Sequence, residues 1–471
     1  MNRYDVVIVG AGPAGIFAAL ELARAGPRRR SLSTLVVEKG PDLAARPRLE
    51  EVRTMGPNDR RLRWQISGFG GAGAYSDGKL TLSPQVGGYL EEFVGKLGLV
   101  DLIEDVDDDY RRFGADDRIY GTGDDVSELR RKASLAGLRL LPVPIRHMGT
   151  DRCLEVLARM HDYLVTRVDL RTETSATRLL ATEGRVVGVE LSSGEIVEAE
   201  HVVVAPGREG SDWLVGEARR LGLTLQQNPV DIGVRVEVPA PVLAPLTDAL
   251  YESKLELYTR AFDDRIRTFC VCPNGEVTAE HTGGEDAVIT VNGHSYAERF
   301  TDRTNFALLV STSFTEPFHE PIAYGRYIAR LANLLSGGVI VQRLGDLRAG
   351  RRSTAERIKR GLVQPTLATA TRGDLSFVLP YRYLANILEM LEAMDQLTSG
   401  VASRNTLLYG VEVKFYSVRP KVSESLETEI RNLFAVGDGA GVTRGLVQAS
   451  ASGLIAAREI LRRTGSVTAD T

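Results

Sequence analysis

The stretch that decides the fold is Asp5-Val6-Val7-Ile8-Val9-Gly10-Ala11-Gly12-Pro13-Ala14-Gly15. Its four consecutive β-branched residues predict a strand that is buried on both faces. The glycines form the pattern G-x-G-x-x-G. Gly10 permits a tight turn, Gly12 lets the backbone approach a pyrophosphate, and Gly15 lets a helix pack closely on the strand. The stretch therefore predicts the strand, turn and helix start of a dinucleotide-binding site.

A second predicted strand, from Thr34 to Val37, ends directly before Glu38. This acid lies 23 residues after Gly15, which is about where a carboxylate takes the hydroxyl pair of an adenosine ribose. Strand, turn, helix, strand and acid follow in the required order. This order favours a dinucleotide site over a glycine-rich turn without a ligand.

The composition sets broad limits on the protein. A chain of 471 residues is too long for one simple core, so we expect two or three domains. A net charge of −4 gives no general reason to expect nucleic acid or an anionic membrane as a partner. The three cysteines cannot build a disulfide framework, and we recognise neither a signal peptide nor a transmembrane segment. We therefore expect a cytoplasmic protein in a reducing compartment, with no nucleic-acid or membrane partner.

A second glycine-rich stretch runs from Ser67 to Lys79, with five glycines between positions 68 and 78. Such a density does not suit the interior of a stable helix or strand. It does suit backbone that lies against a flat or anionic ligand. A flexible surface loop is the alternative, but a loop would be richer in polar residues and would lack Phe69 and Tyr75. We predict that this stretch contacts a ligand.

The rest of the chain alternates between helical and strand patterns. Residues 84–145 are expected to be helical and peripheral, and residues 153–165 to form a helix. A hairpin is predicted around Ser192-Ser193-Gly194. Residues 228–419 show short strands and many turns but no second G-x-G-x-x-G. A separate nicotinamide-binding Rossmann domain is therefore not expected.

Three pieces of the chain match one template: the N-terminal glycine pattern with Glu38, the strand that ends in Ala205-Pro206-Gly207, and Gly437-Asp438 followed by a helix. Together they resemble the glutathione-reductase-type FAD fold without a separate nicotinamide domain. More closely, the chain resembles the family of FAD-dependent dehydrogenases labelled NAD(FAD)-utilising dehydrogenases. Further stretches that carry this resemblance are Gly68–Leu82, Ile145–Asp151, Val230–Val236, Cys270–Pro273, Gly345–Leu347, Leu408–Phe415 and Gly437–Gly441.

This resemblance implies an α/β protein with two main parts. The first is a Rossmann-like FAD-binding domain with a parallel sheet, which we expect to be discontinuous over residues 1–83, 146–226 and 420–471. A helical insertion occupies residues 84–145. The second part is an α+β substrate domain over residues 227–419.

The resemblance also implies that FAD is the cofactor. Glu38 would take the adenosine ribose and Asp438 the ribityl chain. Pro206 stands where related flavoproteins usually have threonine, which removes one backbone donor. The residues that we expect to contact FAD are Gly10, Gly12, Pro13, Ala14, Gly15, Glu38, Lys39, Gly70, Gly71, Ala72, Ser76, Asp77, Gly207, Gly437, Asp438 and Gly439.

Residues 408–416 are the best candidate for a strand that presents catalytic side chains, because catalytic groups are best held on rigid elements. Apolar residues alternate here with Glu412, Lys414 and Tyr416, so one face is apolar and the other carries an acid, a base and a phenol. The alternative is a solvent-exposed polar face. On the catalytic hypothesis, Lys414 tunes or protonates near flavin N5 and Glu412 fixes a substrate amine.

Other candidate residues have two interpretations each. His147 suits acid–base catalysis near neutral pH, or it caps the next helix. Cys270 and Cys272 form C-x-C, not the C-x-x-C of disulfide reductases, and we favour a buried, inert pair over the alternative of a redox-active pair. No metal-ligand spacing stands out, so no metal is expected. Three arginines could clamp a substrate carboxylate or form a basic surface turn: Arg348, Arg351 and Arg352.

The function predicted from these features is that of an FAD-dependent oxidoreductase, a dehydrogenase or oxidase. It would transfer hydride to flavin from a small metabolite, at a C–N or N–N bond, and the substrate could carry a carboxylate. One alternative is a flavin reductase or monooxygenase driven by NAD(P)H. The expected redox partner is transiently bound NAD(P)H or another electron acceptor. The other alternative is a non-redox flavoprotein whose second domain binds a partner.

Overall fold

The computed structural model describes residues 2–24, 32–47, 51, 61, 64, 66–76, 78–123, 125–141, 143–250, 252–281, 287–295, 300–312, 320–415 and 418–465. The chain divides into two compact units, and both are discontinuous in sequence. The first unit comprises residues 1–118, 146–227 and 417–471. The second comprises residues 119–145 and 228–416.

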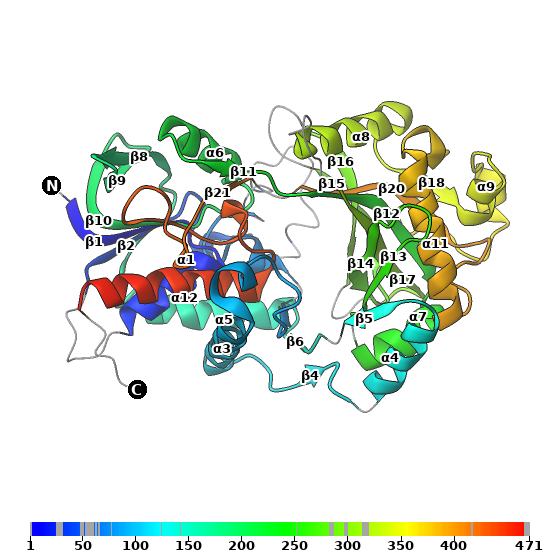
Figure 1. Cartoon of the computed structure of the whole chain (residues 1–471), viewed down its shortest axis with the longest axis horizontal. Coiled ribbons are helices and arrows are strands. Elements are labelled where there is room, and N and C mark those ends of the chain that lie inside the picture. The colour runs from blue at the N-terminus through cyan, green and yellow to red at the C-terminus, as the bar shows by residue number, and fades with distance from the viewer. Residues whose placement is uncertain are drawn as a thin grey trace. The chain divides into compact units, whose positions relative to one another are not determined.

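A seven-stranded sheet forms the centre of the first unit, in the order β7-β2-β1-β10-β9-β8, with β22 also paired to β10 (Figure 1). Strands β7, β2, β1, β10 and β22 are parallel, and β9 and β8 extend the sheet as antiparallel strands. The strands are β1 (Asn2–Val9), β2 (Thr34–Val37), β7 (Asp169–Arg171), β8 (Ala176–Thr182), β9 (Arg185–Leu191), β10 (Ile196–Val204) and β22 (Leu433–Ala435). The predicted hairpin is β9–β10 and is confirmed.

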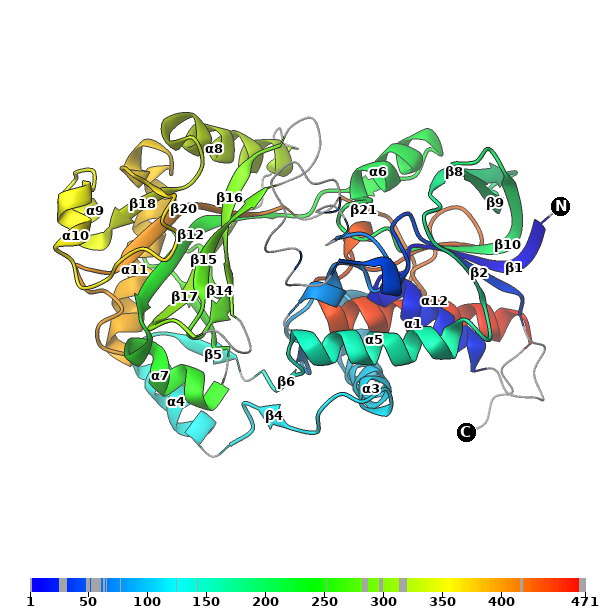
Figure 2. The same ribbon diagram turned by 180° about the vertical axis from the view of Figure 1, so that it is seen from behind.

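Helices cover both faces of this sheet, because its parallel strands are apolar on both sides. On one face α1 and α12 lie side by side, with α5 next to them (Figure 2). A Cβ on Gly453 would lie 2.1 Å from the carbonyl oxygen of Ala14, so α12 packs backbone against backbone on α1. Helix α6 packs on the other face. These helices are α1 (Pro13–Ala23), α3 (Glu91–Arg112), α5 (Thr150–Leu164), α6 (Ser211–Arg220) and α12 (Leu446–Arg463).

The second unit is built on an eight-stranded sheet in the order β19-β18-β20-β12-β17-β14-β13-β5. All neighbours are antiparallel except β18 and β19. The strands are β5 (Arg139–Leu141), β12 (Val230–Pro239), β13 (Lys254–Tyr258), β14 (Arg265–Cys272), β17 (Arg303–Thr312), β18 (Ile340–Arg343), β19 (Thr371–Arg372) and β20 (Leu407–Lys414).

One face of the second sheet packs its apolar side chains against helices, and α11 lies along it (Figure 1). The opposite face carries polar residues and a smaller apolar cluster, to which the hairpin β15–β16 contributes. The helices and the hairpin are α4 (Asp125–Leu135), α7 (Ala240–Leu250), α8 (Pro321–Ser336), α9 (Leu344–Arg348), α10 (Ala355–Lys359), α11 (Tyr381–Leu397), β15 (Glu276–His281) and β16 (Ile289–His294).

The shorter elements complete the description. They are η1 (Leu43–Ala45), η3 (Gly71–Tyr75), β3 (Lys79–Thr81), β4 (Ile119–Tyr120), β6 (Ile145–His147), β11 (Leu225–Gln226), η4 (Leu375–Phe377), β21 (Arg419–Pro420) and η5 (Asp438–Ala440). Across the part of the chain that the structure describes, no helix is long and apolar enough to cross a membrane.

The predicted fold class is confirmed: a Rossmann-like parallel sheet accompanies a mostly antiparallel second sheet. The region expected as one helical insertion, residues 84–145, differs from that expectation. Helix α3 belongs to the first unit, whereas α4 and β5 belong to the second, and β5 pairs with β13. A three-residue strand is too short to show a period of two, so its pairing with a distant segment is not visible in the sequence.

Candidate functional site

The last residues of four parallel strands in the first unit are aligned with one another in the sheet. Val9 is in register with both Val37 and Val204, and Val204 is in register with Ala435. Because the carboxyl ends of β1, β2, β10 and β22 coincide, the segments that follow them leave the sheet at one edge, where α/β sheets bind their ligands. These segments are Gly10–Pro13, Glu38–Gly40, Ala205–Gly207 and Val436–Asp438.

Two glycines allow these segments to approach one another. A Cβ on Gly10 would lie 2.2 Å from the carbonyl oxygen of Ala205, and a Cβ on Gly439 would lie 2.1 Å from that of Gly207. Real side chains do not tolerate such distances, so larger residues would push the backbones apart. The glycines therefore bring three of the four segments into direct contact.

The start of α1 is open to a ligand. Its N-cap, Gly12, provides no capping side chain, and the first turn carries no acidic residue. A Cβ on Gly12 would meet nothing within 4 Å. The first amides of a helix have no partner within the helix and attract phosphate through their N–H groups and the helix dipole. This position fits the pyrophosphate of a dinucleotide.

Glu38 is buried, and backbone amides hold its carboxylate in place. The Ala11 amide donates to Oε2 at 2.9 Å, and the amides of Gly40 and Gly68 donate to Oε1, each at 2.9 Å. A carboxylate has about four acceptor positions, so three amides leave room for a hydroxyl group. The carboxylate joins the first glycine turn to the second glycine-rich stretch.

Arg46, which sequence analysis did not identify, organises that second stretch. Its buried guanidinium donates to the carbonyl oxygens of Phe69 at 2.6 Å, Gly71 at 2.9 Å and Trp64 at 2.7 Å. Burial lowers the pKa of Arg46, although interactions with Tyr75 and Glu38 partly offset this. An arginine that binds main-chain carbonyls shows no local sequence pattern, which is why it was missed.

The second glycine-rich stretch lies against the first. The Gly70 amide donates to the Ala11 carbonyl at 2.8 Å, and a Cβ on Gly71 would lie 3.1 Å from the Cα of Gly12. Within the stretch, Ser76 Oγ donates to the Gly73 carbonyl at 2.8 Å. The predicted contact of the second stretch with a ligand stays a prediction.

The remaining described residues that were predicted to contact FAD lie in or next to the segments described above. Pro13, Ala14 and Gly15 form the first turn of α1, and Ala72 lies in η3. Lys39 forms an ion pair with Glu209 at 3.1 Å. Asp77 lies outside the described residues.

Asp438 begins the short helix η5, directly after β22 and Gly437. Its Oδ1 accepts a hydrogen bond from Thr443 Oγ1 at 2.8 Å, and the Gly445 amide donates to both oxygens at 3.2 Å. Burial raises the pKa of Asp438, and the charge of Arg208 and these hydrogen bonds partly offset the rise. The side chain is 20% exposed, so a ligand can reach its carboxylate.

The second unit holds a buried ion pair on the polar face of β20. Glu412 and Arg235 are both 0% exposed, and their Oε1 and Nη1 atoms lie 3.3 Å apart. Arg235 Nε also donates to Asn305 Oδ1 at 2.8 Å. This face of β20 is therefore not the solvent-exposed polar face that was the alternative to a catalytic strand.

Lys414 continues the same cluster toward solvent. Its Nζ lies 3.2 Å from Glu412 Oε1 and 3.4 Å from Glu280 Oε2, and its side chain is 15% exposed. Burial lowers the pKa of Lys414, but the charges of Glu412 and Glu280 more than compensate, so its pKa lies above the usual value. Lys414 therefore carries a positive charge at neutral pH and is a poor proton donor. Tyr416 lies outside the described residues.

The hairpin β15–β16 covers this cluster. A Cβ on Gly293 of β16 would lie 2.1 Å from both Arg235 Nη2 and Asn305 Oδ1, so the hairpin backbone packs directly on the guanidinium. Arg235 was not predicted as a site residue. The feature of the sequence that could have identified Arg235 is the strand Val230–Pro239, in which charged residues alternate with valines and isoleucine.

The remaining candidates are His147, Arg348, Arg351 and Arg352. His147 ends β6, next to the buried Arg146, which binds Asp107 through two contacts of 2.7 Å. The arginines of α9 and the following turn bind nearby acids: Arg348 pairs with Glu392 at 3.2 Å, and Arg351 with Asp346 at 3.1 Å. Arg352 is exposed. These contacts favour a basic surface turn over a carboxylate clamp.

Known families match both units. The model "FAD-dependent protein, C-terminal domain-like" matches residues 229–415, and the model "FAD binding domain" matches residues 3–59. The model "Glucose inhibited division protein A" matches residues 371–466. An uncharacterised protein of Clostridium beijerinckii is 27% identical over 483 residues, which covers 97% of this chain and 80% of that protein. The resemblance to an FAD-dependent family that was expected from the sequence is confirmed.

Solved structures show similar folds at low identity. Glycine oxidase from Geobacillus kaustophilus is 16% identical with a TM-score of 0.40, over 100% of this chain and 97% of that chain. L-proline dehydrogenase from P. horikoshii is 11% identical with a TM-score of 0.41, over 98% and 94% of the two chains.

Proposed function

We propose that the chain is a member of the FAD-dependent protein family whose model matches residues 229–415, that it binds FAD in its first unit, and that it acts as an oxidoreductase on a small metabolite. The observation that supports the cofactor best is the alignment of four strand ends around the open start of α1. In this proposal the first amides of α1 hold the pyrophosphate, Glu38 binds the adenosine ribose and Asp438 the ribityl chain. FAD supplies the hydride or electron chemistry when it is bound.

We assign to Lys414, in the second unit, the role of attracting the substrate. Its ammonium is fixed between Glu412 and Glu280, and its side chain is 15% exposed, whereas Glu412 and Arg235 are fully buried. Such a fixed charge attracts negative charge on a substrate, for example a carboxylate, and needs no reorganisation during the reaction. Glu412 is fully buried and bound to Arg235, so we assign it to the positioning of Lys414 rather than to a substrate amine.

Substitution of Lys414 tests this assignment. Lys414→Met removes the charge and keeps most of the side-chain length, so packing should change little. We expect the variant to keep FAD but to be reduced or reoxidised at least about tenfold more slowly, or roughly 1.4 kcal/mol of barrier. The measurement is the rate of anaerobic flavin bleaching with a panel of amines, amino acids, NADH and NADPH. The control is Lys359→Met, because Lys359 is exposed on α10.

The outcomes separate the candidate functions. Bleaching by an amine or amino acid supports the proposed oxidoreductase, and bleaching by NADH or NADPH alone supports a reductase or monooxygenase. A protein that holds FAD but is bleached by none of these compounds favours the non-redox flavoprotein. If Lys414→Met reacts at the wild-type rate with an identified substrate, the role given to Lys414 is wrong.

A further inference from the structure

Two cysteines on β14 lie unusually close for residues of one strand. The register of β14 with β17 shifts between Phe269 and Cys272, so β14 carries an extra residue at this point. Cys270 has a φ of +46°, in the left-handed region that non-glycine residues rarely adopt. The resulting bend places the Sγ atoms of Cys270 and Cys272 3.9 Å apart. In a regular strand, residues i and i+2 are separated by two rises of about 3.3 Å each.

The buried cluster around Arg235 meets both cysteines. Arg235 Nη2 lies 3.1 Å from Cys272 Sγ and donates to the carbonyl oxygen of Cys270 at 2.6 Å. The charge of Lys414 also interacts favourably with Cys270. Cations next to a cysteine favour its thiolate, which is the reactive form. Glu412 is the buried carboxylate that faces these two cations.

The two cysteines differ in their exposure to solvent. Cys270 is half-buried, whereas Cys272 is only 1% exposed and lies behind it against Arg235. An oxidant from solvent therefore meets Cys270 first, and Cys272 is placed to react second. No group of three or more histidine, cysteine or acidic side chains arranged to hold a metal ion occurs within the described residues.

We propose that Cys270 and Cys272 form a reversible dithiol–disulfide couple that reacts with low-molecular-weight disulfides. The Cys270 thiolate attacks one sulfur of the small disulfide, breaks its S–S bond and releases one thiolate. The Cys272 thiolate then attacks Cys270 Sγ, breaks the mixed disulfide and releases the second thiolate. Two cysteine thiols lose two electrons and two protons, and the small disulfide becomes two thiols. The proposal does not depend on FAD.

This couple would connect the redox state of small thiols to the contacts that hold Lys414. Formation of the disulfide removes the Cys272 thiol that Arg235 contacts, and Arg235 is the partner of Glu412, which in turn holds Lys414. Cys270 and Cys272, which the sequence alone favoured as an inert pair, thus have a role in thiol–disulfide exchange in this proposal.

The test uses the full-length protein in buffers of glutathione and glutathione disulfide at a series of ratios. Remaining thiols are alkylated, and peptide mass spectrometry measures the fraction of molecules with a Cys270–Cys272 disulfide. We expect this disulfide to form in the native protein as the disulfide fraction rises and to disappear with dithiothreitol. Cys153 is the internal control, because it is buried and distant in sequence, and should stay a thiol. If Cys270 and Cys272 remain thiols even in pure glutathione disulfide, the proposal is wrong.

Two variants test the order of attack. Cys272→Ser should accumulate a mixed disulfide with glutathione at Cys270, because no second thiol resolves it. Cys270→Ser should react at least about tenfold more slowly, because the remaining sulfur is buried. Thermal unfolding curves show whether each variant is folded. Equal reaction of both variants, or a stable glutathione adduct on the wild-type protein, contradicts the assigned roles.

Discussion

At the scale of single residues, Glu38 combines a structural and a ligand-binding role. Its carboxylate accepts three backbone amides from two glycine-rich segments and is expected to bind the ribose as well. Sequence spacing predicted the second role but not the first. Substitution of this residue should therefore affect the protein with and without FAD.

The first prediction concerns Glu38→Gln. The substitution replaces one acceptor oxygen by an NH₂ group that faces donor amides and removes the negative charge. We expect FAD binding to weaken by about 1–3 kcal/mol and the apoprotein to lose stability as well. FAD titration and urea unfolding measure the two effects. Glu200→Gln is the control, because the Glu200 side chain forms an exposed pair with Arg185, and the backbone carbonyl that accepts from Asn432 is unchanged. Unchanged FAD affinity in Glu38→Gln would contradict the assigned site.

The second prediction concerns Arg46, which holds the second glycine-rich stretch through several carbonyl groups. Arg46→Met leaves buried carbonyls without donors, so we expect a loss of at least about 2 kcal/mol in the free energy of unfolding. Urea unfolding measures this loss. Arg131→Met should cost less than about 1 kcal/mol, because Arg131 forms only a surface pair with Glu128 on α4. Similar losses of stability in both variants would contradict the role of Arg46 in holding the second glycine-rich stretch.

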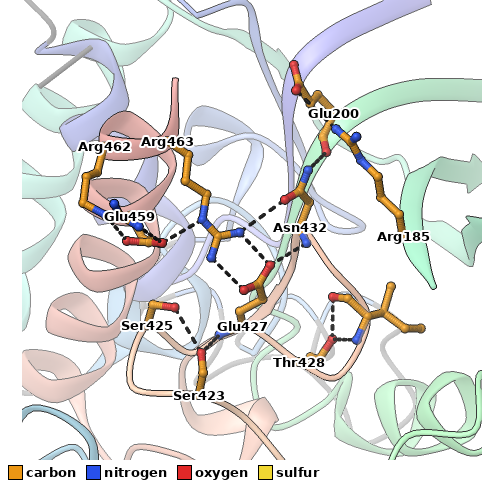
Figure 3. A network of polar contacts seen from close by, with 11 residues as sticks. Arg185, Glu200, Ser423, Ser425, Glu427, Thr428, Asn432, Glu459, Arg462 and Arg463 are labelled. Atoms are coloured by element: carbon orange, nitrogen blue, oxygen red, sulfur yellow. Dashed lines mark hydrogen bonds and ion pairs between the residues drawn. The ribbon is translucent and has the colours of Figure 1, made fainter. Parts of the chain in front are cut away.

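At the scale of elements, a polar network secures the end of α12 (Figure 3). Arg463 binds both oxygens of Glu427 at 2.7 Å, and it also binds Glu459 at 2.7 Å and Asn432 at 3.2 Å. Asn432 directly precedes β22, the strand that leads into Gly437 and Asp438, and Glu427 forms an antiparallel bridge with Phe434 of that strand. The network therefore connects α12 to the strand that ends at the candidate site.

The third prediction is the pH dependence of this network. Hydrogen bonds from Arg462 lower the pKa of Glu459 to about 2, with Arg463 adding to the shift, and hydrogen bonding to Arg463 lowers the pKa of Glu427. A carboxylate whose pKa is lowered by folding stabilises the protein above its unfolded pKa, about 4.3, and loses this contribution as the pH falls toward the folded value. We expect Arg463→Met to cost about 1–2 kcal/mol at pH 7 and less at pH 3. Urea unfolding of both proteins at the two pH values measures this difference, and a cost that grows at low pH would contradict it.

Some elements were predictable from the sequence and others were not, for physical reasons. The strand at Asp5–Val9 and the residues after it follow a local pattern, as do the hairpin at 192–194 and β20. The environment of Glu412 could not be predicted, because it depends on the pairing of β20 with β12 and on the packing of the distant hairpin β15–β16 on the cluster. The alternation of apolar and polar residues along β20 was predicted correctly. Which face of the strand other elements cover is decided by contacts between segments that are far apart in the sequence.

At the scale of the whole molecule, each unit is assembled from separated segments. Residues 119–145 belong to the second unit: β5 pairs with β13, and α4 packs its apolar side chains into the same core as the second sheet. The sequence suggested a peripheral insertion because the helices in this region are amphipathic. A cut of the chain near residue 228 therefore does not separate two complete domains.

The fourth prediction follows from this division. A fragment of residues 228–416 should be less stable than one in which residues 119–145 are joined to it by a flexible linker. The difference should be at least about 2 kcal/mol, since the added segment buries several aliphatic side chains, each worth roughly 1.5–3 kcal/mol. Far-ultraviolet circular dichroism and urea unfolding of the two fragments measure it. Equal stability would show that residues 119–145 are dispensable to the second unit.

The most direct test of the central proposal is the flavin content of the purified full-length protein. The absorption spectrum is recorded, the protein is denatured, and the released cofactor is identified by chromatography. Protein that emerges without cofactor is first mixed with FAD and then separated from the excess. We predict a yellow protein that carries close to one FAD per chain. A colourless protein that cannot be reconstituted with FAD would contradict the proposed function.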